Sequence, residues 1–254
     1  MTYTHILSRP FQFQFHRSFW NCAPRCFGSC HHIIARRLNC TTKRKMVKLY
    51  YTATSCGAGN FITAFISGVN IECEVVDLST HLTASGVDFY TINPKGNVPA
   101  IVLDDGTLLN ENAATLQYLA DLDPSHKLLP AHGEISRYEV ISALSYVGSE
   151  YHKAVGHLFN PTLSDEVKSY FVNLTKSKLA HLNDSLLKNQ TFLVGGKLSI
   201  ADIYLFICLS WSGYLNIDLS SYPNVQAYQS RVADLDSIKA AQAAIASNPA
   251  TTAA

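Results

Sequence analysis

The sequence predicts an α+β domain followed by an all-α domain, and three observations indicate this division. Short β-rich segments alternate with helical segments in the first part of the body. The stretch "LDPSHKLLPAHGE" (122–134) then reads as a linker that contains Pro, His and Gly. Beyond it, apolar residues recur at helical spacing. The expected ranges are an α+β domain over 46–124, a linker over 125–134, an all-α domain over 135–245 and a disordered tail over 246–254.

The α+β domain begins with a strand, a helix and a second strand. The segment "VKLYYT" (47–52) is β-rich, and "IECEVVDL" (71–78) reads as the second strand. Between them, "GNFITAFISGV" (59–69) carries Phe61 and Phe65 at helical spacing. The three segments form a βαβ unit.

The same domain continues with a hairpin and a helix. In "PAIVLDDGTLLN" (99–110), two short apolar runs flank Asp104-Asp105-Gly106, which is a strong hairpin signal. The segment "ENAATLQYLADL" (111–122) has helical periodicity. The order β-α-β followed by β-β-α is that of the thioredoxin-like fold.

Three helices are predicted for the all-α domain. In "RYEVISALSYVGSEYHKAV" (137–155), an apolar stripe faces the core, and His152 lies with Ser145 and Ser149 on a polar face. A second helix covers 167–187. The third, over 198–215, opens with a capping-box variant and is apolar nearly all round, so we expect it at the centre of the domain. The stripe consists of Val140, Leu144, Val147 and Tyr151. The capping residues are Ser199 and Asp202, and the Ala-rich end (240–254) is expected to fray.

Residues 1–45 differ in composition from the rest. They hold eight Lys and Arg and no Asp or Glu, and subtracting the eight from 20 leaves 12 basic against 19 acidic residues, a formal charge of −7 for the body. An acidic body argues against a nucleic-acid partner. The basic segment fits a mitochondrial transit peptide, although Pro10 and Pro24 interrupt any amphipathic helix. The alternative is an untranslated leader before Met46, or a disordered tail. No apolar run reaches the length of about 18 residues that a membrane helix needs.

The cysteines indicate reduced thiols. A zinc site in the leader is disfavoured because the spacing of its Cys and His residues matches no standard zinc signature. Only Cys56, Cys73 and Cys208 lie in the body, odd in number and widely spaced, which favours an intracellular compartment. The leader residues in question are Cys22, Cys26, Cys30, His31 and His32.

Three segments resemble the glutathione transferase family. The segment "NPKGNVPAIVLDDGTLLNENAATLQYLAD" (93–121) resembles its glutathione-binding core, and "LVGGKLSIADIYLF" (193–206) its second-domain capping region. "YYTATSC" (50–56) with "SEYHKAVGHLFNP" (149–161) resembles the bacterial-type beta class, which has a cysteine after the first strand and a His-Lys pair on a second-domain helix. The resemblance covers about residues 46–240.

The resemblance implies a set of glutathione-binding residues. It implies a cis bond between Val98 and Pro99, which would turn the Val98 backbone outward to pair with a bound peptide. Glu111 would meet the γ-glutamyl amino group, and Asn112 with its N–H the carboxylate, at a helix start; plain helix-start chemistry is the alternative for Glu111. Asn97, next to Val98, joins this set. At the position where relatives often carry a lysine for the glycyl carboxylate, this chain has His81, which would weaken that contact at neutral pH.

Cys56 is the first candidate for the reacting centre. It lies at a helix start, which lowers thiol pKa values, and it would hydrogen bond a glutathione thiolate or form a mixed disulfide with it. Ser55 is the rival, because other transferase classes use a hydroxyl here, and a buried structural thiol is the other alternative. His152 would contact the sulfur and Lys153 would place a positive charge near the peptide, unless both simply belong to a solvated helix face.

The resemblance therefore predicts a homodimeric, cytoplasmic glutathione transferase, or a mitochondrial one if the leader is a transit peptide. Glutathione is its cosubstrate, no metal is required, and the electrophile would lie against an aromatic second-domain wall. The alternatives are a glutathione-dependent thiol-disulfide reductase that uses Cys56 covalently, and a non-catalytic glutathione-binding scaffold. The aromatic residues available for the wall are Tyr146, Phe159, Trp211 and Tyr214.

Overall fold

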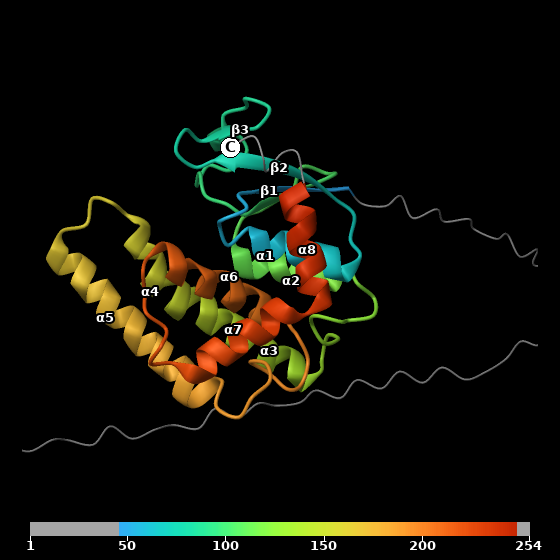
Figure 1. The fold of residues 1–254 in the computed structure, drawn as a ribbon. Helices are drawn as coiled ribbons and strands as arrows, with labels where there is room; N and C mark the ends of the chain where they lie inside the picture. The colour runs from blue at the N-terminus through green and yellow to red at the C-terminus, as the bar shows by residue number, and fades with distance from the viewer. Residues whose placement is uncertain (1–45, 248–254) are drawn as a thin grey trace, which may run out of the picture. The chain divides into compact units, whose positions relative to one another are not determined.

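The computed structural model describes residues 46–247 (Figure 1). The expectations for the basic leader, its cysteines and histidines, and residues 248–254 lie outside the described residues.

A five-stranded mixed sheet forms the base of the first domain, in the order β3-β2-β1-β4-β5. β1 pairs in parallel with β2 and antiparallel with β4, and the β4–β5 and β2–β3 pairs are antiparallel. Gly106 turns the predicted hairpin with φ 82°, a conformation that favours glycine. The strands are β1 (Val47–Tyr51), β2 (Ile71–Asp77), β3 (Leu82–Thr83), β4 (Ala100–Leu103) and β5 (Leu108–Leu109).

Two helices cover one face of this sheet. α1 (Ala58–Ser67) and α2 (Asn112–Asp121) contact each other. Alternate residues of β1, such as Leu49 and Tyr51, pack with Leu119 of α2 in a core with no exposed side chain. The opposite face carries a smaller core around Phe89, which lies in the short 3-10 turn η1 (Phe89–Thr91). The elements from β1 to α2 form the predicted thioredoxin-like domain.

The helical domain follows. Its largest core surrounds α6, which is buried along most of its length, as predicted for a central helix. The predicted capping box is confirmed: Ser199 Oγ accepts from Asp202 N, and Asp202 accepts from Ser199 N at 2.9 Å. The helices are α3 (Ile135–Tyr146), α4 (His152–Gly156), α5 (Asp165–His181), α6 (Ile200–Tyr214), α7 (Pro223–Asp234) and α8 (Asp236–Ser247).

Two of the predicted helices are interrupted. The helix expected over 137–155 is divided by a π-helical turn, Val147–Tyr151, and a second π-helical turn, Leu182–Leu186, follows α5. The predicted buried stripe is nonetheless confirmed, because Val140, Leu144, Val147 and Tyr151 are all buried. The stripe therefore stays in the core across the π turn, and α4 begins directly after that turn.

The expected fraying of the Ala-rich end is wrong for residues 240–247. These residues form the last two turns of α8 (Asp236–Ser247), which runs beside α1 (Figure 1). Ile238 and Ala241 are fully buried in the core of the helical domain. Alanine is the strongest helix former, and here tertiary packing supplies the rest of the stabilisation.

None of the helices within residues 46–247 is long and apolar enough to cross a membrane.

Candidate functional site

Cys56 lies in the loop between β1 and α1. Its side chain is buried, and its Sγ lies 3.7 Å from the carbonyl oxygen of Val98, a residue 42 positions further along the chain. The Val98–Pro99 peptide bond is cis, as the resemblance implied. The structure thus brings two of the predicted site residues together.

Burial has the opposite effect on Cys56 from the one expected at a helix start. It raises the pKa of the Cys56 thiol to about 12, and the backbone N–H groups of Cys56 and Gly57, which lower the pKa, are smaller contributions. The expected depression of this pKa is therefore wrong for the protein without ligand. At neutral pH Cys56 is a thiol, which can donate a weak hydrogen bond.

The Ser55 hydroxyl is engaged within its own loop. It donates to the Thr52 carbonyl at 2.8 Å and accepts from the Gly57 N–H at 3.1 Å. These bonds shape the turn that carries Cys56. The bond to the Thr52 carbonyl uses the one donor that the Ser55 hydroxyl has.

Glu111 is the N-cap residue of α2, but its carboxylate makes no capping hydrogen bond. It pairs instead with Lys95, whose Nζ lies 2.5 Å from Glu111 Oε1. Plain helix-start chemistry thus does not account for this side chain. Asn112, the first residue of α2, turns its side chain inward, where its Oδ1 accepts from Asn60 of α1 at 2.6 Å. The backbone N–H groups of the first helical turn have no acceptor within the helix.

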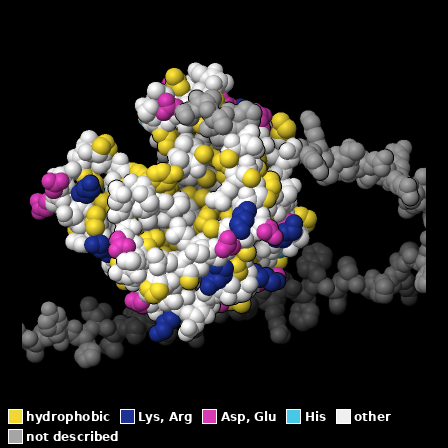
Figure 2. Space-filling view, in the orientation of Figure 1, with side chains coloured by type: hydrophobic (Ala, Val, Ile, Leu, Met, Phe, Trp, Pro, Cys, Tyr) yellow, Lys and Arg dark blue, Asp and Glu magenta, His cyan; other side chains and the backbone are white. Residues whose placement is uncertain are grey.

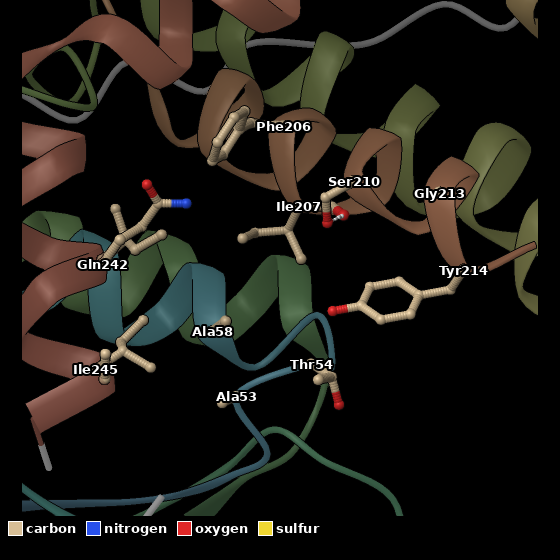
Figure 3. Close-up of a pocket in the computed structure, with 12 residues that line it drawn as sticks. Ala53, Thr54, Ala58, Phe206, Ile207, Ser210, Gly213, Tyr214, Gln242 and Ile245 are labelled. Atoms are coloured by element: carbon tan, nitrogen blue, oxygen red, sulfur yellow. Dashed lines mark hydrogen bonds between the residues drawn. The ribbon is translucent and has the colours of Figure 1, made fainter. Parts of the chain in front are cut away.

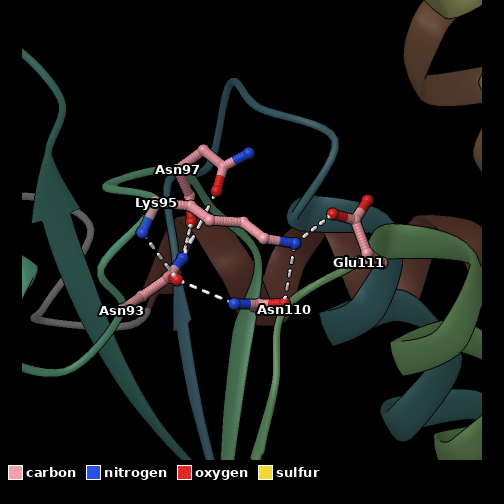
Figure 4. A network of polar contacts seen from close by, with 5 residues as sticks. All are labelled: Asn93, Lys95, Asn97, Asn110 and Glu111. Atoms are coloured by element: carbon pink, nitrogen blue, oxygen red, sulfur yellow. Dashed lines mark hydrogen bonds and ion pairs between the residues drawn. The ribbon is translucent and has the colours of Figure 1, made fainter.

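A chain of asparagines connects the Val98 loop with Glu111 (Figure 4). Asn93 is fully buried and donates to the carbonyl of Asn97 at 2.6 Å. Asn110 donates to Asn93 Oδ1 at 2.8 Å, while its own Oδ1 lies 3.2 Å from Lys95 Nζ. The sequence alone assigns no role to Asn93 or Lys95, because the pattern of residues in a loop carries no information about the direction of its side chains.

His152 directly follows the π-helical turn. Its Nδ1 is hydrogen bonded to the Tyr204 hydroxyl, and its ring packs edge-on against Trp211 with the centroids 4.9 Å apart. Burial, with a smaller contribution from Lys153, lowers the pKa of His152 to about 4. Burial is the main cause of the raised pKa of the Tyr204 hydroxyl, with smaller contributions from Cys208 and Cys56. The two domains thus contribute Cys56 and Tyr204 to one buried cluster, and His152 joins this cluster through its hydrogen bond to Tyr204.

Lys153 and His81 lie outside this cluster. The Lys153 side chain is exposed on α4, and it forms no ion pair within residues 46–247. His81 has φ 55° and its ring packs at a tilt against Tyr90, with ring centroids 4.5 Å apart. Tyr90 in turn covers Gly96, where an added Cβ would clash with the ring. Tyr90 therefore connects His81 with the 93–98 loop.

Aromatic residues of the helical domain are divided between three places. Trp211 donates from Nε1 to the Thr54 carbonyl at 2.9 Å and packs edge-on against Phe159, so both adjoin the Cys56 loop. Tyr214 lies further along α6 and is 67% exposed. Tyr146 contacts the ring of His181, with centroids 5.3 Å apart.

An apolar cavity of about 850 Å³ begins at Ala53 and Thr54, just before Cys56. It is lined by α1, α6 and α8, and the ring of Tyr214 reaches across it toward the Thr54 loop (Figure 3). Apolar side chains also gather on the surface along the junction between the sheet and the helices (Figure 2). Side chains from α6 and α8 that line it include Phe206, Ile207, Gln242 and Ile245.

No group of three or more His, Cys, Asp or Glu side chains within the described part of the chain could hold a metal ion. The body cysteines Cys56, Cys73 and Cys208 are free thiols.

Comparison with known proteins identifies this arrangement. Family models described as "Glutathione S-transferase, N-terminal domain" and "Glutathione S-transferase, C-terminal domain" match residues 58–122 and 172–236. Glutathione S-transferase GstA of Escherichia coli O157:H7 is 36% identical over 198 residues, which cover 78% of this chain and 98% of GstA.

Two solved structures extend the comparison. A sphingomonad glutathione S-transferase complexed with glutathione is 39% identical with a TM-score of 0.74, covering 79% of this chain and 100% of that one. A beta-class transferase from Sphingomonas chungbukensis is 42% identical with a TM-score of 0.73, covering 78% and 98%. The chain therefore belongs to the glutathione S-transferase family, with the beta class among its structural neighbours.

Proposed function

We propose that this transferase conjugates the glutathione thiolate to small apolar or aromatic electrophiles. The observation that carries the proposal is the contact of Cys56 with the Val98 carbonyl, in a core that Cys56 shares with Tyr204, the hydrogen-bond partner of His152. The sphingomonad relative was solved with glutathione bound, which supports the same cosubstrate here.

Glutathione would bind along the edge formed by Val98 and the start of α2. The backbone of Val98 pairs with the cysteinyl backbone of the peptide in the manner of an added strand. The carboxylate of the γ-glutamyl group accepts from N–H groups in the first turn of α2, where the helix dipole favours an anion. Glu111 receives the ammonium of the same group, and the exposed Lys153 contributes positive charge near the peptide. His81, held on Tyr90, would reach the glycyl carboxylate only by a change of rotamer.

Neutral donors would stabilise the glutathione sulfur as a thiolate. The raised pKa of Cys56 keeps its S–H intact, so the thiol donates to the glutathione sulfur. The Tyr204 hydroxyl, protonated because burial raises its pKa, donates to His152 Nδ1 and leaves the proton of the neutral imidazole on Nε2, where it can serve as a second donor. The thiolate attacks the electrophilic atom, the carbon–sulfur bond forms as the leaving group departs with its electron pair, and the sulfur's proton has already passed to solvent.

The electrophile would occupy the apolar cavity that begins at Thr54. Binding there removes apolar substrate surface from water at about 25 cal/mol per Å² and holds the electrophile beside the sulfur. Trp211, which is hydrogen bonded to the Thr54 carbonyl, fixes the loop between the cavity and Cys56.

The reductase alternative requires Cys56 to attack as a thiolate. A pKa of about 12 leaves only about one thiol in 10⁵ ionised at pH 7, which favours the donor role over the nucleophilic one. The scaffold alternative predicts glutathione binding without either activity.

Cys56→Ser tests these roles. Serine keeps a donor of similar size, so conjugation of a dinitrohalobenzene should fall by about tenfold or less, about 1.4 kcal/mol of transition-state stabilisation. Any disulfide reduction, and any glutathione adduct on Cys56 seen by intact mass under oxidising conditions, should disappear. Cys73→Ser, at a half-buried thiol on β2, is the matched control and should change neither activity.

Three outcomes decide against the proposal. Loss of conjugation by a hundredfold or more in Cys56→Ser would make the sulfur atom itself essential. Efficient disulfide reduction without conjugation in the wild-type protein would favour the reductase. Binding of glutathione with neither activity would favour the scaffold.

We further propose a homodimer in a reducing compartment. Large apolar side chains are exposed on both domains, including Leu82 and Tyr90 on one and Tyr138 and Tyr170 on the other, and family dimers pack the first domain of one chain against the second of its partner. The free thiols suit the cytoplasm. The mitochondrial alternative depends on residues 1–45.

A further inference from the structure

Lys95 pairs with Glu111, the carboxylate that the proposed function assigns to the ammonium group of the ligand. Its Nζ lies 2.5 Å from Glu111 Oε1 and 3.2 Å from Asn110 Oδ1 (Figure 4). An α-ammonium group, like a lysine side chain, donates three hydrogen bonds and carries one positive charge. The two oxygens that would recognise the γ-glutamyl ammonium therefore already hold an ammonium from the protein itself.

The acceptor side of this arrangement is fixed. Asn110 donates from Nδ2 to Asn93 Oδ1 at 2.8 Å, and this bond directs its Oδ1 toward Lys95. Asn93 is fully buried and is itself held by the bond it donates to the Asn97 carbonyl at 2.6 Å. Because the peptide-pairing residue Val98 follows Asn97, the same network holds the acceptors in register with the predicted ligand backbone.

The Lys95 side chain can move away from the two oxygens that it contacts. The Lys95 side chain is 50% exposed and that of Glu111 is 68% exposed. An ion pair at that exposure is weak, and the flexible four-carbon stem lets Nζ move into water without any change in the backbone. Two ammonium groups on the same pair of oxygens would repel each other, so one must leave when the other arrives.

We propose that Lys95 is an internal competitor for the glutathione ammonium and thereby a specificity-determining residue. This inference rests on the proposed function, because it assigns Glu111 to the ligand's amino group. While the site is empty of ligand, Lys95 neutralises Glu111. A ligand with an α-amino group displaces Lys95, whereas an analogue that lacks this group leaves the Lys95–Glu111 pair in place.

The consequence is a reduced preference for the natural ligand. In the wild-type protein, the gain from placing the α-ammonium on Glu111 is diminished by the loss of the Lys95–Glu111 pair. In Lys95→Met there is no Lys95–Glu111 pair to break, so the whole binding free energy of the α-ammonium on Glu111 contributes to the affinity for glutathione. An exposed pair contributes about 1 kcal/mol at most, which corresponds to about fivefold in a dissociation constant.

The experiment measures Kd by titration calorimetry for glutathione and for its des-amino analogue, which carries glutaryl in place of γ-glutamyl. The quantity of interest is the Kd of the des-amino analogue divided by the Kd of glutathione. The analogue carries one more net negative charge than glutathione, so a control variant must measure how the loss of one lysine charge by itself changes this ratio. We expect Lys95→Met to raise this ratio by about fivefold, mainly by tightening glutathione. Lys95→Arg keeps a cation on Glu111 and should retain the wild-type ratio. Lys127→Met, which removes an exposed lysine paired with Asp123, is the control for loss of one positive charge and should also retain it.

An equal ratio in the wild-type protein and Lys95→Met, with both binding glutathione, would overturn the role of Lys95 alone. A weaker affinity of Lys95→Met for glutathione with an unchanged ratio would do the same, because Lys95 would then act as a general attractive charge. Absence of glutathione binding in the wild-type protein would overturn the proposed function itself. In Glu111→Gln the ratio should fall close to one. A ratio that stays high in this variant would show that Glu111 does not bind the ligand's ammonium group, and the inference would then be wrong.

Discussion

At the scale of single residues, burial shifts the pKa values of Cys56 and His152 in opposite directions, and both shifts favour the uncharged side chain. It raises the pKa of the acid Cys56 to about 12 and lowers that of the base His152 to about 4, so both side chains are uncharged at neutral pH. In the proposed function, these neutral groups are the donors that stabilise the anionic sulfur of glutathione. A protonated Cys56 avoids placing a second thiolate beside that sulfur.

This protonation state makes a prediction about pH dependence. Because the pKa of His152 is lowered to about 4, the imidazole is already neutral at pH 5 and stays neutral as the pH rises. The pH profile of kcat/KM for conjugation should therefore show no step from His152 between pH 5 and 8, and its rise should follow ionisation of the glutathione thiol. His152→Gln, which keeps an N–H donor, should lower kcat/KM by about tenfold without changing the shape of the profile.

His157→Gln supplies the control, since His157 lies exposed on the next turn and stacks on Phe171 rather than on the cluster. It should leave the rate and the profile unchanged. A wild-type step near pH 6 to 7 that vanishes in His152→Gln would contradict the neutral imidazole.

The sequence predicts where some of these residues lie, but it does not predict their pKa shifts or their contacts in loops. The positions of Cys56, Val98 and Glu111 could be predicted because each lies in a motif with fixed spacing from a strand or helix end. The direction of the Cys56 pKa shift could not, because it depends on how many atoms the second domain packs around the sulfur. Lys95 was missed for a similar reason: an exposed lysine in a loop has no pattern that predicts which carboxylate it meets.

At the scale of elements, strands and helices with long apolar patterns were predicted to within a few residues, and elements that depend on tertiary contacts were not. β3 is two residues long, too short for any alternation to be visible, and it exists because it pairs with Val76 and Asp77 of β2. The π-helical turn before His152 has no local signature either. Val147 and Tyr151 would share a face in an ordinary α-helix too, so their burial does not predict the π turn. Such turns are frequent at functional sites.

An ion pair joins the neighbouring strands β1 and β2, and it should make the free energy of unfolding depend on pH in the acid range. Glu74 of β2 is buried, its Oε2 lies 2.7 Å from Lys48 Nζ, and its Oε1 accepts from Ser85 N at 3.2 Å. Although burial opposes ionisation, the hydrogen bonds from Lys48 and Ser85 lower the pKa of Glu74 to about 2. A carboxyl with a depressed pKa stabilises the fold above its unfolded value of about 4.3 and loses this contribution as the pH falls toward 2.

Glu74→Gln should therefore lower the free energy of unfolding by about 1 to 2 kcal/mol at pH 7, and the difference from wild type should shrink between about pH 4 and pH 2. Urea unfolding at a series of pH values measures both. Glu72→Gln removes the other carboxylate near Lys48, at 3.1 Å, but Glu72 is 52% exposed and its loss should cost less. A constant difference at every pH would mean that Glu74 acts through packing rather than through its charge.

At the scale of the whole molecule, the site exists only because two domains meet. The Trp211 bond to the Thr54 carbonyl joins α6 to the loop before Cys56, and α1 contacts α6 and α8 as well as α2. The thioredoxin-like domain supplies Cys56, Val98 and Glu111, and the helical domain supplies His152 and the greater part of the cavity lining. The loop that carries Cys56 is therefore positioned from both sides, and neither domain alone would hold the full arrangement.

Residues 46–254 should accordingly suffice for folding, glutathione binding and dimerisation. β1 begins at Val47, every contact described for the site lies downstream of it, and the 198 residues that align with GstA span 98% of that protein. A chain that starts at Met46 should be retained on a glutathione resin, elute with free glutathione, and sediment at micromolar concentration with twice its own chain mass. Insoluble protein, or folded protein that passes through the resin, would show that residues 1–45 contribute to the fold or the site. Retention on the resin combined with sedimentation at the mass of one chain would leave the glutathione site in place and refute the dimer, because the two readouts test different surfaces of the molecule.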